Sequence, residues 1–219
     1  PADISLRVNL IELLEHQERW NEVLDQYVDL ASTYRHLADF SSARSTYDQA
    51  VKLAQRTGAP ATKMVEILHK LGEVDMERIE LRGAMRTYQR ILEIAPDNVK
   101  ARRHLAELHY RLNNPVQGIQ EIDLLLQNYA KQKRPDLILE VLEEQTQSYP
   151  NDMALRSRLG GVYQQMRQNE KAFEQFEALR RLQSEAGLHD EARQTIRRII
   201  SLNPPQVSHY QQLLQQMGG

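Results

Sequence analysis

Apolar residues recur at helical spacing along nearly the whole chain. Leu6, Leu10, Leu13 and Leu14 follow one helical face near the start, and Val141 and Leu142 continue the same spacing much later. Pro and Gly gather in short clusters at residues 58–60, 95–98, 113–115, 149–152 and 203–205. No convincing strand alternation interrupts this pattern. The sequence therefore predicts about twelve helices of roughly 11 to 19 residues, joined by loops so short that neighbouring helices pack antiparallel.

A second pattern recurs on a longer scale. Each occurrence has a leucine followed by a small residue, at 30–31, 71–72, 105–106 and 159–160. The next helix carries another small residue and, four positions later, a large one: Tyr47, Tyr88, Ile122 or Phe176. Small side chains on both helices allow the backbones to approach, and the large residue fills the space beside them. We assign a structural packing role to the small residues Ala31, Gly72, Ala84, Gly118, Gly160 and Ala172.

This order of Leu, small residue, Tyr, Ala, aromatic residue and closing Pro resembles the tetratricopeptide repeat. The resemblance covers roughly residues 20 to 216. It implies an all-α fold, a right-handed superhelical solenoid of antiparallel helix pairs. We expect a single repeat domain over residues 1–219, with units near 24–57, 65–98, 99–150 and 153–204. Residues 205–219 would then form a terminal capping helix.

The repeat spacing changes along the chain. The step from Leu71 to Leu105 has the length of one ordinary repeat, whereas the steps from Leu105 to Leu159 and from Leu159 to Leu213 are longer and equal. An additional helix accounts for each longer step, at residues 136–150 and 189–204. One helix would then belong to two overlapping pairs. The spacing predicts three-helix units of about 53–54 residues in the C-terminal half.

Composition excludes several classes of function. The chain has 28 Lys and Arg against 30 Asp and Glu, a formal net charge of −2, so it lacks the positive surplus of a general nucleic-acid binder. No apolar run reaches the length of a membrane span. With no Cys there is no thiol nucleophile or Cys-ligated metal, and His104 and His109 are spaced for different helix faces. We expect no enzymatic activity, no metal and no cofactor.

The family resemblance implies a ligand groove on the concave face, lined by the first helix of each pair. Charge on these helices changes from acidic near the N-terminus to basic in the middle of the chain. Arg103 and Arg111 beside Tyr110 could hold a carboxylate or a phosphorylated side chain through forked hydrogen bonds. The predicted partner-binding groove consists of Lys70, Glu73, Lys100, Arg103, His104, Glu107, Tyr110, Arg111 and Arg158.

These observations favour a non-catalytic scaffold that binds a peptide or helix of a partner protein in its concave groove. One alternative is a regulatory or sensory repeat domain of a larger signalling or transcription protein. A weaker one is an RNA-associated helical repeat. No membrane insertion is expected, and the absence of Cys fits a cytoplasmic location. Exposed terminal helices would allow self-association.

Overall fold

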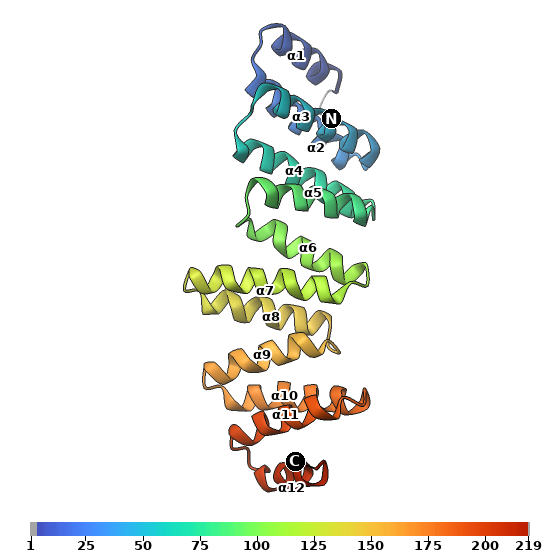
Figure 1. Cartoon of the computed structure of the whole chain (residues 1–219). Helices are drawn as coiled ribbons and strands as arrows, with labels where there is room; N and C mark the ends of the chain where they lie inside the picture. The colour runs from blue at the N-terminus through green and yellow to red at the C-terminus, as the bar shows by residue number, and fades with distance from the viewer. Residues whose placement is uncertain (1–3, 219) are drawn as a thin grey trace. The chain divides into compact units, whose positions relative to one another are not determined.

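The computed structural model describes residues 4–218, and all the regular structure in this range is α-helical (Figure 1). The predicted all-α class and the predicted number of helices are confirmed. The twelve helices are α1 (Ile4–His16), α2 (Trp20–His36), α3 (Phe40–Thr57), α4 (Ala61–Glu77), α5 (Leu81–Ile94), α6 (Val99–Arg111), α7 (Pro115–Lys131), α8 (Pro135–Ser148), α9 (Met153–Gln165), α10 (Asn169–Glu185), α11 (His189–Ser201) and α12 (Val207–Gln216).

The chain forms two compact units, and the division between Leu125 and Leu126 falls inside α7. In the first unit each helix from α1 to α6 packs against the next. In the second unit α8 to α12 pack in the same sequential way. The single repeat domain expected over residues 1–219, with its unit boundaries, stays a prediction.

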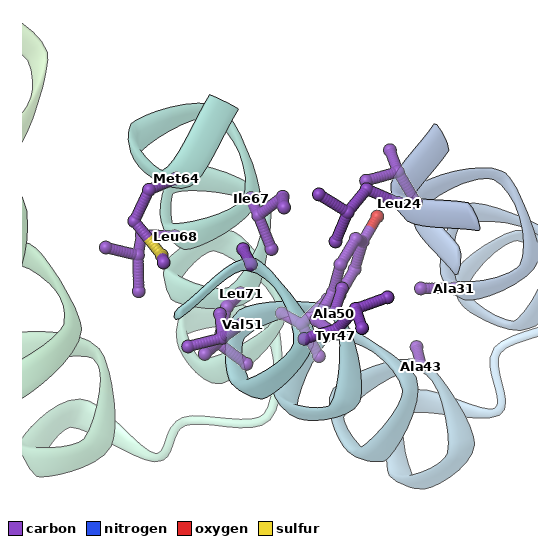
Figure 2. Close-up of a cluster of buried hydrophobic side chains, with 14 of the residues drawn as sticks. Leu24, Ala31, Ala43, Tyr47, Ala50, Val51, Met64, Ile67, Leu68 and Leu71 are labelled. Carbon is purple, nitrogen blue, oxygen red and sulfur yellow. The ribbon is translucent and has the colours of Figure 1, made fainter. Parts of the chain in front are cut away.

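The core of the first unit is built from successive helices. Tyr47 of α3 is fully buried with Leu24 of α2 and Ile67 of α4, and its hydroxyl lies 2.9 Å from the Ser32 hydroxyl (Figure 2). Burying a large apolar side chain contributes about 1.5–3 kcal/mol. Because each helix contacts mainly its chain neighbours, stability is distributed along the array.

Close helix approach at glycine is visible in both units. A Cβ atom added to Gly72 of α4 would lie 2.7 Å from the ring of Tyr88 on α5. In the second unit, a Cβ on Gly160 of α9 would lie 2.5 Å from the ring of Phe176 on α10. Each aromatic ring therefore occupies the space that a side chain on the facing helix would need. Both rings are fully buried.

The pair α6 and α7 reverses this arrangement. The glycine is on the second helix, at Gly118, and the ring pressed against it is Tyr110 of the first helix. A Cβ on Gly118 would lie 2.7 Å from two carbons of that ring. Ile122 holds the position that an aromatic residue fills in the other pairs, and it is buried too. In this pair the aromatic residue is on the first helix and the glycine on the second, and the two helices still approach closely.

The helices within each hairpin are joined by one recurrent turn. A residue in the left-handed region ends the turn, and the next N–H donates to the carbonyl five residues back, as Asn114 does to His109 at 2.8 Å. In the described chain this pattern occurs after Glu18, Ala38, Gly58, Ile79, Asn113, Lys133, Arg167 and Gly187, and at Gly58 it joins α3 to α4. The turns at 113 and 133 are separated by the same number of residues as the turns at 167 and 187. The second pair of turns therefore repeats the first pair at one constant offset along the chain.

Asp75 of α4 is a fully buried carboxylate between helices. It occupies the place along its helix that Tyr34 and Tyr163 hold in theirs. Arg44 of α3 donates from Nε to one carboxylate oxygen at 2.7 Å, while the other oxygen has no hydrogen-bond partner among the described residues. Burial raises the pKa of Asp75, although the Arg44 guanidinium acts in the opposite direction.

The adjacent glycines of α9 offer a direct test of the packing. Gly160→Ala should destabilise the chain by about 1–2 kcal/mol, because the new methyl group collides with the Phe176 ring. Gly161→Ala meets only the end of the long Arg198 side chain, at 3.3 Å, and should leave stability unchanged or raise it by up to about 1 kcal/mol through helix propensity. Urea denaturation of both variants measures the difference. Equal effects would contradict the proposed contact.

Asp75 should make stability depend on pH in a defined direction. A raised pKa means that the folded chain binds the proton more readily than the unfolded chain. The stability that this group supplies therefore falls as pH rises from the ordinary Asp pKa, about 3.9, through the raised value. Compared with Asp75→Asn, the natural chain should lose free energy of unfolding between pH 4 and pH 7. A gain over this range would show that the ion pair with Arg44 outweighs the burial.

Candidate partner-binding groove

The predicted groove residues come mainly from two helices of the first unit. Lys70 and Glu73 lie on α4, and the residues from Lys100 to Arg111 lie on α6. Along α6, Lys100, Arg103, Glu107 and Arg111 follow one another at intervals of three or four residues, which places them on one face. Arg158 lies on α9 in the second unit, where its guanidinium donates to the Ala154 carbonyl at 3.0 Å.

Glu73 connects the first helices of three successive pairs. Its carboxylate accepts from Arg35 of α2 at 3.0 Å and from Lys100 of α6 at 2.7 Å. Arg35 also donates to Glu77, one turn further along α4, at 2.5–3.0 Å. Burial opposes the charge of Glu73, but Lys100 and Arg35 outweigh it and hold the pKa of Glu73 below its usual value. We call Arg35, Glu73, Glu77 and Lys100 the charge ladder.

A second carboxylate lies among the predicted cations of α6. Glu107 is 3.8 Å from His104 and 3.4 Å from Arg111. His104, with Arg111 nearby, holds the pKa of Glu107 below its usual value. The face that the sequence predicts to be basic is therefore an alternation of cations and carboxylates. A ligand that pairs with these cations must first displace the internal carboxylate from them.

His104 is fixed by aromatic packing as well as by charge. Its ring stacks on Tyr88, with centroids 4.6 Å apart and planes 20° apart. His69 of α4 lies 6.0 Å from the same tyrosine, and its Nε2 is 3.1 Å from Asn98 Oδ1. Burial, followed by the Lys100 charge, lowers the pKa of His69, so this imidazole is neutral at pH 7.

Tyr110 and Lys70 differ from the rest of the predicted set. Tyr110 packs its ring against Gly118, so a structural role accompanies the aromatic contact that we expect it to offer a ligand. Lys70 is half-buried, and it has no acidic partner within ion-pair distance among the described residues. This ammonium group is available to a ligand without breaking an internal pair.

Glu77 and Asn98 are additional polar residues at this face that the predicted groove leaves out. Glu77 follows Glu73 by four residues, so helical spacing alone could have placed both on the same face. Asn98 precedes α6, where its side chain accepts from the Ala101 N–H at 2.9 Å, and the same oxygen meets His69. An Asn before a helix indicates a cap, but nothing in the sequence indicates its second contact.

The described residues contain no cluster of three or more His, Asp or Glu side chains that could hold a metal ion. None of the helices in the described range is long and apolar enough to cross a membrane. The surface is thus a set of charged side chains on neighbouring helices, suited to forming ion pairs and hydrogen bonds with a second molecule.

Comparison with known proteins supports the repeat assignment. The tetratricopeptide repeat family matches residues 26–57 and residues 80–135. No curated protein matches the chain significantly in sequence. The matched segments contain most of α2, all of α3, and α5, α6 and α7, and they include three of the six small packing residues: Ala31, Ala84 and Gly118.

Several solved structures resemble the chain at low sequence identity. BtubC (BKLC) from P. vanneervenii is 15% identical, with a TM-score of 0.50 over 98% of this chain and 86% of that one. YrrB, described as a tetratricopeptide-repeat protein with an unusual peptide-binding site, is 16% identical, with a TM-score of 0.43 over 79% and 91%. A tetratricopeptide repeat protein from Parabacteroides merdae is 14% identical, with a TM-score of 0.42 over the full length of both chains.

Of the close contacts described above, that of Gly118 with the Tyr110 ring lies wholly within the matched residues 80–135. The two sequence matches show that residues 26–57 and 80–135 are tetratricopeptide repeats, and with the all-α fold they support the assignment of the chain as a tetratricopeptide-repeat protein.

Proposed function

We propose that the chain is a non-catalytic scaffold that binds an acidic segment of a partner protein across α2, α4 and α6. The observation that carries the proposal is the charge ladder, in which Glu73 joins Arg35 and Lys100 across three helices. A partner segment lying across these helices meets charged groups from all three. Repeat proteins of this kind present extended surfaces of neighbouring helices to their ligands.

The internal pairs explain how such a surface can be specific. The ion pairs of Glu73 and Glu107 are only partly exposed; a fully exposed pair contributes about 0–1 kcal/mol, so a carboxylate on the ligand can replace either acceptor at moderate cost. Lys70 supplies an ammonium group with no competing acid among the described residues. Segments that lack acidic residues cannot compensate for the ion pairs they disturb. The surface therefore favours ligands with carboxylates spaced to reach Lys70 and Lys100.

Peptides selected from a displayed random library against the purified chain provide the ligand for a test. Lys100→Glu should weaken binding of the selected acidic peptide about tenfold, because attraction is replaced by repulsion. Glu73→Gln should have the opposite effect and strengthen binding, because Lys100 and Arg35 lose the negative charge of their internal carboxylate. Fluorescence anisotropy measures both dissociation constants.

Lys52→Glu is the matched control, since Lys52 is an exposed lysine on α3, a second helix of the same unit. It makes the same charge change and should alter the affinity less than twofold. All three variants should melt within a few degrees of the natural chain. Equal losses for Lys100→Glu and Lys52→Glu would reject the groove in favour of a general charge effect. Weaker binding by Glu73→Gln would reject the proposal that a ligand carboxylate replaces Glu73 in its ion pairs.

A further inference from the structure

A cavity of about 330 Å³ lies away from the charge ladder, where α5 meets the turn between α6 and α7. Arg82, Met85 and Arg86 of α5 form one side. His109 of α6, with Leu112 and Asn114 of the following turn, forms the other. Lys100 lies nine residues earlier along α6, so this cavity and the ladder are near opposite ends of that helix. The volume is at the lower end of the range for small-ligand sites.

The lining carries uncompensated positive charge. Arg82 and Arg86 are one helical turn apart and exposed, and neither has an ion-pair or hydrogen-bond partner among the described residues. No carboxylate lines the cavity. The guanidinium groups therefore keep their forked donors available for a planar or tetrahedral oxyanion.

His109 adds an unsatisfied polar atom. Its Nδ1 is buried and has no hydrogen-bond partner among the described residues, although the residue lines the cavity. The backbone around it is held firmly, since the Asn114 N–H donates to the His109 carbonyl and Asn113 is in the left-handed region. Because that nitrogen is buried, His109 serves the cavity as a fixed wall.

Two other cavities of the molecule show what distinguishes this one. Near α10, a cavity of about 480 Å³ combines Arg156 and Arg181 with three glutamates. Between the turn before α2 and the loop after α3, a cavity of about 420 Å³ contains Arg19, which pairs with Glu22 at 2.5–2.6 Å. In both, the chain supplies its own carboxylates. The cavity beside α5 is lined by two arginines and by no carboxylate.

We propose that the cavity beside α5 binds an oxyanion on a partner polypeptide, a phosphorylated or carboxylate side chain next to an apolar residue. Arg82 and Arg86 hold the oxyanion through charge-assisted hydrogen bonds. Met85 and Leu112 provide the apolar contact for the neighbouring residue. The site is separate from the surface assigned to the acidic segment, and it gives the chain a second point of recognition.

The test uses a labelled peptide, Leu-phosphoserine-Leu within a neutral sequence, with Ser and Glu counterparts at the central position. Fluorescence anisotropy against the natural chain, Arg86→Gln and Arg90→Gln measures binding. Arg90 is the matched control, one turn further along α5 and outside the cavity lining. We expect Arg86→Gln to weaken binding of the anionic peptide at least tenfold and Arg90→Gln less than twofold. Arg82→Gln should reproduce the loss.

The three peptides separate the sources of the oxyanion. Tighter binding of the phosphoserine peptide identifies phosphate, and equal or tighter binding of the Glu peptide identifies carboxylate. Binding of the Ser peptide as tight as either, or no binding of any peptide, overturns the proposal. Equal losses for Arg86→Gln and Arg90→Gln also overturn it. Lys100→Glu should leave this binding unchanged, whereas a loss would place the peptide at the charge ladder instead and leave the cavity without a role.

Discussion

Close approach of paired helices is the constraint on which the rest of the structure depends. A glycine on one helix faces an aromatic ring on its neighbour at Gly72, Gly118 and Gly160, with separations that leave no room for a Cβ atom. This contact fixes how near the helices lie. The distance between successive first helices follows from it, and that distance allows Glu73 to reach both Arg35 and Lys100. Packing at small residues thus positions a charged surface.

Much of the fold could be predicted from the sequence because its signals are local. Helical spacing of apolar residues and the recurrence of Leu with Gly or Ala depend only on neighbouring positions. The turns were less visible, since Ile79, Lys133 and Arg167 adopt left-handed backbone without glycine. Their geometry is set by the hydrogen bond that closes the turn. The reversal at Gly118 and Tyr110 is a choice between two equivalent packings, which sequence spacing does not distinguish.

The candidate surface was harder to predict than the fold. Helical spacing places charged residues on a common face, but it does not say which charges neutralise one another between helices. Glu73 and Glu107 convert a strip expected to be basic into alternating ion pairs. The cavity that the α5 arginines line and the buried carboxylate of Asp75 leave no recognisable signal in the sequence. Each depends on contacts between residues of different helices.

Hydrogen–deuterium exchange of the chain with a bound acidic peptide tests the central claim, that recognition occurs on the first helices through the charge ladder. The account predicts slower exchange in α4 and α6, with a smaller change in α2, while α3 and α5 exchange as in the free chain. Protection confined to α3 and α5 would contradict it, because the ligand would then lie on the second helices, where the charge ladder contributes nothing.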